Sequence, residues 1–297
     1  MHIPVLLKEV IKYIQPQPGE NFIDATVGEG GYTICLLQHT TPSGKVLGID
    51  LDNESLKIAE QKLKAFGDRV ILKQGNFKDV DEIVRETNFS SVDGIVFDLG
   101  LGTFQIEESK RGFSFLRDEP LKMTFNPESA LTAEDVINGE SLESLTKIFK
   151  EYGEERNALK IAQVIVEQRR KKRITRTKEL VEIILKALHK ESFKGRRHPA
   201  TKIFQAIRIF VNDELNNLSI ALEKSLKILN PSGRIAVVSY HSLEDRIVKN
   251  FFRDNNKRGL LKIITKKPII PSEDETNENP RSRSARLRII QKVVNSK

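Results

Sequence analysis

The sequence contains one cysteine, Cys35, among its 297 residues. A single thiol excludes an internal disulfide and leaves no cysteine and histidine cluster of the kind that holds structural zinc. No uninterrupted apolar run approaches the length of about 20 residues that crosses a bilayer. The start of the chain has no basic region ahead of an apolar core, so we expect no targeting signal and no membrane association. We therefore expect a cytoplasmic protein.

The composition is that of a globular protein with a basic surplus. Hydrophobic residues make up 38% of the chain, which is enough for a core, and no fixed-period repeat is present. A chain of 297 residues can form one large domain or two of ordinary size. Lysine and arginine (49) outnumber aspartate and glutamate (41), which gives a net charge of +8. The surplus favours a polyanionic partner, although many soluble proteins are mildly basic.

The stretch from Asn21 to Asp52 organises the rest of the chain. It holds a short apolar run, a glycine turn that begins at Gly28, a helical segment and a second apolar run that reaches Asp50. Glycine lets the backbone approach a ligand closely. An acid at the tip of the second strand can accept hydrogen bonds from both ribose hydroxyls. This unit therefore predicts a nucleoside-cofactor site.

Details of the turn favour one nucleoside. A dinucleotide fingerprint, G-x-G-x-x-G, would place a third glycine where Thr33 stands. Asp24, four residues before Gly28, ends the first strand and can face an amine-bearing ligand. S-adenosylmethionine has an ammonium, a sulfonium and a ribose diol, and no phosphate, so it fits this pattern. The alternative is that the glycines only make a tight turn and Asp24 caps the following helix.

Four short apolar runs alternate with helical periodicity over the first hundred residues. This alternation predicts a doubly wound, Rossmann-like α/β sheet, in which ligands bind beyond the carboxyl ends of the strands. The residues at those ends are Asp24, Asp50, Phe77 and Asp98. Phe77 can stack on an adenine or pack in the core. Asp98 ends the strand nearest the expected reaction centre, or caps a turn.

From residue 105 to residue 209 strand signals vanish and helical periodicity dominates. We expect a helical domain (105–209) inserted into a sheet domain formed by 1–104 and 210–297. It carries five consecutive cations at 169–173. Such a run is usually a solvated face, but it also suits phosphate contacts. The predicted nucleic-acid-binding residues, which include two arginines of a later loop, are Arg169, Arg170, Lys171, Arg196, Arg197, Arg281 and Arg283.

After the insertion the pattern predicts one long helix from Ala200 to Leu229 and a strand over 233–240. Ser242 and Asp245 match a capping box for the helix that follows. Two late apolar runs, 260–265 and 287–293, are expected to form a closing hairpin around a polar loop. Arginine and serine alternate at the end of that loop and offer hydrogen-bond donors to phosphate.

In order along the chain, these segments resemble the MraW-type family of ribosomal RNA cytosine-N4 methyltransferases. Each segment is weakly specific alone, whereas the ordered set is highly specific and covers nearly the whole chain. The matching segments are His2-Ile3-Pro4-Val5-Leu6-Leu7, Asp24-Ala25-Thr26-Val27-Gly28-Glu29-Gly30-Gly31, Gly48-Ile49-Asp50-Leu51-Asp52, Asp98-Leu99-Gly100, Arg111-Gly112-Phe113-Ser114-Phe115, Tyr152-Gly153-Glu154-Glu155, His198-Pro199-Ala200-Thr201-Lys202-Ile203-Phe204-Gln205-Ala206-Ile207-Arg208, His241-Ser242-Leu243-Glu244-Asp245-Arg246 and Asn279-Pro280-Arg281-Ser282-Arg283-Ser284.

The resemblance implies a class I methyltransferase sheet with an inserted all-helical domain for RNA recognition. It implies S-adenosylmethionine as methyl donor and N4 of a cytosine in the decoding centre of small-subunit ribosomal RNA as target. The partner is then that RNA or the assembled small subunit; a homodimer is compatible with the sequence, although no feature predicts one. The implied cofactor contacts are Gly30, Gly31, Tyr32, Asp50, Phe77, Asp98 and Gln105, to which the pattern itself adds Asp24 and Gly28.

The chain departs from the family pattern at three places. Tyr32 stands where the family usually has histidine, Gly102-Thr103 where it has a serine pair or serine and threonine, and Lys122-Met123-Thr124 where Asp-Met-Arg is typical. Gly102 and Lys122 flank the expected substrate entrance. They therefore bear on rate or target choice more than on cofactor binding.

A mechanism follows from the strand end at Asp98. We hypothesise that Asp98 and the backbone carbonyls of Leu99 and Gly100 orient the cytosine amine, that the base leaves its stack, and that no metal takes part. A DNA amino-methyltransferase would carry a Pro-Pro-aromatic motif after the acid, and a nicotinamide-dependent oxidoreductase would carry a third glycine. A relic that binds RNA without turnover stays open as an alternative.

Overall fold

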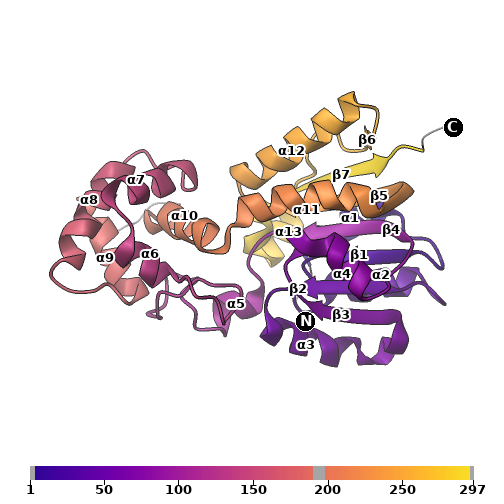
Figure 1. Ribbon diagram of the computed structural model, residues 1–297, viewed down its shortest axis with the longest axis horizontal. Helices are drawn as coiled ribbons and strands as arrows, with labels where there is room; N and C mark the ends of the chain where they lie inside the picture. Colours follow the sequence, from indigo (N-terminus) through magenta and orange to yellow (C-terminus); the bar gives the residue numbers. More distant parts are fainter. Residues whose placement is uncertain (1–3, 190–197, 295–297) are drawn as a thin grey trace. The chain divides into compact units, whose positions relative to one another are not determined.

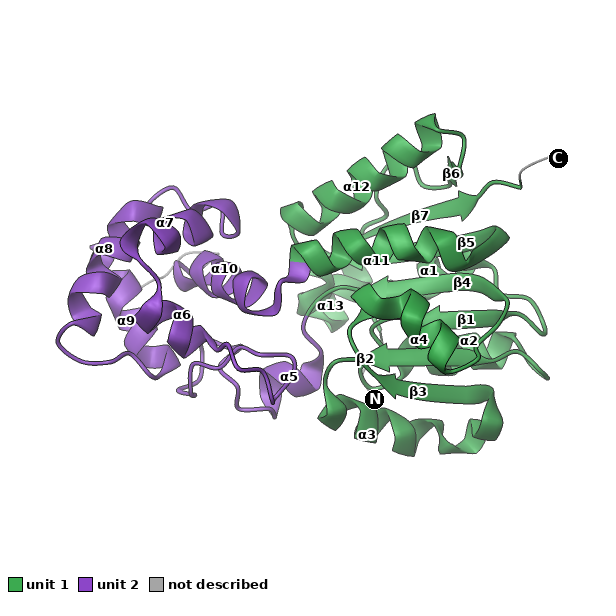
Figure 2. Cartoon of the chain, viewed as in Figure 1, with its two compact units in different colours: residues 1–100, 215–297 green, residues 101–214 purple. Residues whose placement is uncertain are grey.

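The computed structural model describes residues 4–189 and 198–294, and it divides into two compact units (Figures 1 and 2). Unit 1 consists of residues 1–100 and 215–297, and unit 2 of residues 101–214. The sequence pattern had placed the insertion at 105–209. Two predicted RNA contacts, Arg196 and Arg197, lie outside the described residues, as do His2 and Ile3 of the first matching segment.

Unit 1 is built on one seven-stranded sheet with the order β3-β2-β1-β4-β5-β7-β6. The strands from β3 to β5 in this order are parallel, whereas β7 runs antiparallel to both β5 and β6. The predicted Rossmann-like α/β class and the late hairpin are confirmed. The bounds are β1 Asn21–Asp24, β2 Val46–Asp50, β3 Val70–Gln74, β4 Val92–Asp98, β5 Leu229–Ser239, β6 Leu261–Ile263 and β7 Arg286–Lys292.

Helices cover both faces of this sheet because alternate strand residues point to opposite sides. Phe22 and Val96 join the core beneath α1, α2 and α3, while Ile23 and Phe97 join the core beneath α4, α11 and α12 (Figure 1). All four of these side chains are buried. The helices are α1 Leu7–Ile14, α2 Gly31–His39, α3 Asn53–Leu63, α4 Val80–Glu86, α11 Glu214–Ile228 and α12 Ser242–Lys257.

The long helix predicted from Ala200 to Leu229 is wrong. The structure has α10 (Ala200–Asn212) and α11 (Glu214–Ile228), separated at Asp213, whose backbone is left-handed with φ of 50°. Aspartate is one of the few residues besides glycine that tolerate this conformation. Apolar spacing continues across the break, so the periodicity does not reveal it. The loop expected between the late strands also contains α13 (Glu273–Glu278) and a 3₁₀ turn, Pro280–Ser284.

Within its described residues unit 2 is helical, and the strand-like pairing there is one bridge between Pro120 and Arg176. Two of the segments that carry the family resemblance, 152–155 and 198–208, pack against each other in this unit. Gln205 of α10 donates a hydrogen bond to the carbonyl of Tyr152 at 3.1 Å, and a Cβ on Gly153 would lie 2.7 Å from the carbonyl of Lys202. The other helices of unit 2 are α5 Thr103–Glu107, α6 Ala133–Gly139, α7 Leu142–Glu151, α8 Ala158–Arg169 and α9 Thr177–Ala187.

Candidate active site

Three carboxylates end three neighbouring parallel strands of unit 1. Asp24 ends β1, Asp50 ends β2 and Asp98 ends β4, and the sheet places β1 between the other two. In the strand register Asp24 is paired with Gly48 and Val96, so Asp50 and Asp98 each extend two residues further. The predicted meeting of these acids at one edge of the sheet is therefore what the structure has.

Asp50 holds the glycine turn. Its Oδ2 accepts a hydrogen bond from the Gly28 amide at 2.9 Å, and its Oδ1 accepts one from the Asp52 amide at 2.9 Å. Burial raises the pKa of Asp50 to about 6, although these two amides oppose the shift. A carboxylate has further lone pairs, so both oxygens can also accept bonds from a ligand.

The turn itself needs glycine at two positions for different reasons. Gly30 precedes α2 with φ of 87°, a left-handed conformation that disfavours side chains. Gly31 begins α2 beneath Pro4, and a Cβ there would lie 2.4 Å from the proline Cγ. The backbone of the turn is therefore close-packed on one side by the N-terminal segment.

Asp24 is fully buried and only half satisfied. Its Oδ2 accepts a hydrogen bond from the Thr33 hydroxyl at 2.7 Å, in the first turn of α2. The N-cap of α2 is Gly30, with no side-chain cap bond, so the alternative in which Asp24 caps this helix is wrong. Its Oδ1 has no hydrogen-bond partner among the described residues. Burial raises the pKa of Asp24 to about 6, against the effect of Thr33. An unpaired buried carboxylate oxygen suits a cationic ligand group, such as the ammonium of S-adenosylmethionine.

Asp98 is held by a residue that the sequence analysis missed. The hydroxyl of Tyr240, directly after β5, donates a hydrogen bond of 2.7 Å to Asp98 Oδ1, and the Asp98 amide donates one of 2.7 Å to Thr26 Oγ1. Burial raises the pKa of Asp98 to about 7; Tyr240 opposes this shift, while Asp24 and Glu244 add to it. The sequence signal that could have identified Tyr240 is its position as an aromatic residue at the carboxyl end of the strand next to that of Asp98.

The capping box predicted from Ser242 and Asp245 is also wrong. His241 is the N-cap of α12, and Glu244 closes the box by accepting a bond from the His241 amide at 3.3 Å. Asp245 instead faces the sheet, where its carboxylate accepts bonds from Arg288 at 2.7 and 3.1 Å and from Arg286 at 3.2 Å. Two arginines attract that carboxylate more strongly than a cap position would.

Two predicted cofactor residues have aromatic side chains with partners inside unit 1. The Tyr32 ring is buried and its hydroxyl donates to the carbonyl of Val5, so a ligand contact at Tyr32 would use its backbone. Phe77 is partly exposed and lies edge-on to Phe97, with 5.8 Å between ring centroids. Its exposed part is what remains for an adenine.

Gln105 belongs to unit 2, where it is buried in the first turn of α5. Its Oε1 accepts a hydrogen bond from the Gly102 amide at 2.7 Å. Gln105 therefore satisfies the amide of Gly102 at the start of α5, whereas Gly102 has no side chain that could accept a hydrogen bond from the helix amides. Lys122, the other departure, is exposed.

A family model described as the MraW methylase family matches residues 1–293. The chain belongs to that family. A ribosomal RNA small subunit methyltransferase H from Thermotoga neapolitana is 49% identical over 295 residues, which cover 98% of this chain and 96% of that protein. A protein of the same name from Persephonella marina is 47% identical over 292 residues, covering 98% of this chain and 99% of that protein.

Among solved structures, a SAM-dependent O-methyltransferase from Thermotoga maritima aligns over 98% of this chain and 66% of its own, with 11% identity and a TM-score of 0.43. The resemblance to the MraW-type family is confirmed by the family match, and with it S-adenosylmethionine as the cofactor. In this methylase the half-satisfied Asp24 and the Asp50 turn are the residues present that fit the donor.

The basic run of this family member closes α8 in unit 2. Arg169 is partly buried and donates to the carbonyl of Ile137 at 2.8 Å, and Lys171 is paired with Glu167 at 3.0 Å. Arg170 is exposed, and no side-chain partner is seen for it in 4–189 or 198–294. Exposed ion pairs are weak, so the paired cations can exchange carboxylate for phosphate. Arg281 and Arg283 are exposed on the 3₁₀ turn of unit 1.

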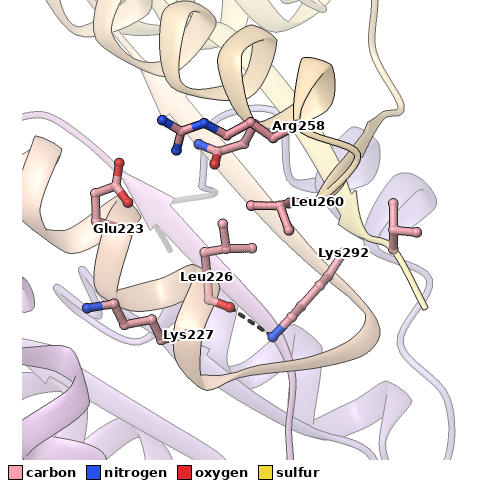
Figure 3. Close-up of a pocket in the computed structure, with 8 residues that line it drawn as sticks. Glu223, Leu226, Lys227, Arg258, Leu260 and Lys292 are labelled. Atoms are coloured by element: carbon pink, nitrogen blue, oxygen red, sulfur yellow. Dashed lines mark hydrogen bonds between the residues drawn. The ribbon is translucent and has the colours of Figure 1, made fainter. Parts of the chain in front are cut away.

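A cavity of about 300 Å³ lies at the other end of the unit 1 sheet (Figure 3). Its walls come from the last turns of α11 and α12 and from the end of β7. Lys292 crosses it to donate hydrogen bonds to the carbonyls of Leu226 at 2.9 Å and Leu229 at 2.6 Å, so this lysine caps α11. The three acids lie at the opposite strand ends, and this cavity is not their site.

No helix of the described ranges is long and apolar enough to cross a membrane.

Proposed function

We propose that this methylase transfers a methyl group from S-adenosylmethionine to N4 of a cytidine in the decoding centre of small-subunit ribosomal RNA, in the cytoplasm. The observation that carries the proposal is the Asp98 carboxylate. One of its oxygens is held by Tyr240, and it lies on the same sheet edge as the cofactor acids. The relatives, which are named as ribosomal RNA small subunit methyltransferases, support RNA as the substrate class.

The cofactor residues divide the ligand among them. Asp50 accepts hydrogen bonds from the ribose hydroxyls, and Asp24 Oδ1 accepts one from the ammonium. The backbone of Gly28, Gly30 and Gly31 lets the ligand approach, and Phe77 flanks the adenine. When bound, S-adenosylmethionine supplies a methyl group on a sulfonium sulfur, and its positive charge offsets the clustered carboxylates. Tyr32 and Gln105 complete the proposed contacts.

The residues at the end of β4 handle the amine. The lone pair of N4 is delocalised into the cytosine ring, so the amine must be turned toward the methyl group before it can attack. Asp98 accepts the proton that N4 loses as the new N–C bond forms and the S–C bond breaks, with its electron pair left on sulfur. The carbonyls of Leu99 and Gly100 accept the remaining amine hydrogen bond and fix the plane of the base.

RNA contacts come from both units in this proposal. The cations at the end of α8, Arg169, Arg170 and Lys171, and the exposed Arg281 and Arg283 bind phosphates. The helical unit thereby recognises the RNA. Asp98 lies at a strand end within the folded sheet unit, so it cannot reach a base that stays paired in a duplex. The target base therefore leaves its stack to meet Asp98.

The test is methyl transfer to small ribosomal subunits from cells that lack this modification. We expect transfer by the wild type and loss of at least about a thousandfold in Asp98→Ala, with cofactor affinity retained within a few-fold. The exposed Asp68→Asn change, at the opposite end of the sheet, is the matched control and keeps full activity. Tight RNA binding by the wild type without transfer would instead support the binding relic.

A further inference from the structure

The two oxygens of the Asp98 carboxylate have different surroundings. Oδ1 accepts the 2.7 Å hydrogen bond from the Tyr240 hydroxyl, whereas no hydrogen bond to Oδ2 is seen in the described part of the chain. Asp98 is partly exposed, so Oδ2 is the oxygen open to a ligand. Tyr240 therefore determines which oxygen of Asp98 a substrate can meet.

The position of Tyr240 is fixed on both sides. Its amide donates to Glu244 Oε2 at 2.8 Å, which anchors its backbone to the first turn of α12. Its ring lies against Gly100, where a Cβ would be 2.9 Å from the ring carbon Cδ2. Asp98 is fixed in turn by Thr26. The contact is thus built from β1, β4, β5 and α12 and is not a chance approach of two mobile side chains.

The charges around Asp98 explain why a hydroxyl is needed there. Asp24 and Glu244 repel negative charge on Asp98, and burial disfavours it as well. The hydrogen bond from Tyr240 is the one influence in this set that favours the ionised form. Burial, followed by the nearby Asp98 charge, raises the pKa of Tyr240 well above its usual value, so the phenol keeps its proton and remains a donor.

We propose that Tyr240 is a positioning residue for methyl transfer, which keeps Asp98 ionised and turns Oδ2 toward the amine of the target base. This proposal rests on the proposed function, because it assigns Asp98 the role of proton acceptor. Tyr240 touches neither the cofactor nor the reacting atoms in this scheme and acts through Asp98 alone.

The experiment compares Tyr240→Phe with the wild type from pH 6 to pH 9 at saturating cofactor. Loss of the hydrogen bond raises the pKa of Asp98, so the acidic limb of the kcat profile moves to higher pH by about one unit, a tenfold loss of kcat on that limb. Turnover at pH 9 recovers to within a few-fold, and the cofactor KM stays unchanged. The control is Tyr13→Phe, a partly buried tyrosine of α1 whose hydroxyl makes no hydrogen bond to the residues that the structure describes.

A loss of equal size at every pH would overturn the proposal, because it would mean that the ring only supports the fold. A second measurement does not depend on turnover. In protein labelled with ¹³C at aspartate carboxyls, the Asp98 signal of cofactor-free Tyr240→Phe titrates at higher pH than that of the wild type. If the wild type transferred no methyl group to RNA, this titration would still test the link between Tyr240 and Asp98. An unmoved titration would reject it.

Discussion

The Gly28 amide lies 2.9 Å from Oδ2 of Asp50, so the acid predicted to bind ribose also fixes the glycine turn. The other oxygen of Asp50 accepts the Asp52 amide at 2.9 Å, and Asp52 begins α3 as its N-cap. One carboxylate therefore orders the turn on one side and the next helix on the other. The proposed cofactor contact and the local fold thus depend on the same group.

This relationship makes Asp50→Asn a cofactor-binding variant. An amide can accept from only one of the two backbone N–H groups, and its own NH₂ then opposes the other. We expect the dissociation constant for S-adenosylmethionine to rise by about ten- to a hundredfold, the range for lost bonds to a charged acceptor. Isothermal titration calorimetry measures it, and Asp68→Asn serves as control; equal affinities in the two variants would contradict the assignment.

Three strand-end acids make the free energy of unfolding depend on pH, and the two assigned to the cofactor, Asp24 and Asp50, should make cofactor affinity depend on pH as well. Their pKa values in the folded protein are about 6 for Asp24 and Asp50 and about 7 for Asp98, above the usual 3.8. The folded protein without cofactor therefore binds more protons than the unfolded chain between about pH 4 and 7, and its free energy of unfolding falls as pH rises through that window.

A bound cationic ligand opposes this loss of stability, because its positive charge favours the ionised form of the acids. We expect the affinity for S-adenosylmethionine to rise from pH 5 to pH 7, by up to about tenfold per pH unit for each acid that must ionise. Calorimetric titrations at fixed ionic strength measure this slope. An affinity that is constant or falls over this range would show that the acids do not face the cation.

Gly100→Ala tests the packing of the Tyr240 ring without removing any polar group. The added methyl would lie 2.9 Å from the ring, so the ring must move and its hydrogen bond to Asp98 must lengthen. We expect kcat to fall by at least about tenfold while cofactor affinity holds. Gly259→Ala, where φ is 72° and a Cβ meets nothing within 4 Å, is the control for the backbone strain that a side chain adds at the positive φ of Gly100. Unchanged kcat in Gly100→Ala would mean that the ring can shift at no cost.

Asp245→Asn tests the joint between α12 and β7. It leaves Arg288, which is 9% exposed, without a charged partner. We expect the free energy of unfolding to fall by roughly 2 kcal/mol, less than the about 3–5 kcal/mol for a fully broken buried ion pair, because asparagine still offers an oxygen to one arginine. Burial raises the pKa of Asp245, but the two arginines outweigh it and hold that pKa below its usual value, so the stabilisation is present near neutral pH and is lost as pH falls below about 4.

The comparison for that variant is Asp254→Asn, which breaks an exposed pair with Arg253 on the same helix. Urea unfolding monitored by circular dichroism measures both. The exposed variant should match the wild type, because surface ion pairs contribute little. Equal losses in the two variants would contradict the structural role of Asp245.

Arg170→Ala should weaken RNA binding in a salt-dependent way. The cation is exposed at the end of α8, and each phosphate contact removed reduces the slope of log affinity against log salt by about one. Filter binding to small-subunit RNA between 50 and 300 mM salt measures the slope. Lys257→Ala, at the far end of α12, is the control; the same slope in wild type and Arg170→Ala would remove α8 from the interface.

The edge of the sheet could be predicted because it is encoded locally. An apolar run followed by an acid defines each of Asp24, Asp50 and Asp98 as a strand end, and parallel strands bring such ends to one edge. The placement of Phe22 and Ile23 on opposite faces of the sheet follows from the alternation of side chains along a strand. No long-range information was needed for these residues.

The remaining features depend on contacts that a local pattern does not contain. The Tyr240 hydroxyl meets Asp98 across 142 residues of sequence, through the pairing of β4 with β5. Ser242 and Asp245 match the capping pattern as well as His241 and Glu244 do, and Arg288 on a distant strand decides between them. At Asp213 the left-handed backbone ends a helix inside continuous apolar spacing.

The most direct test of the central claim is to identify the atom that is methylated. Small subunits lacking the modification are incubated with the protein and labelled S-adenosylmethionine, and the RNA is digested and analysed by mass spectrometry. The account predicts N4-methylcytidine at a single decoding-centre cytidine, absent with Asp98→Ala. Label on a ribose oxygen, on a ring carbon or on a nucleotide outside the decoding centre would contradict it.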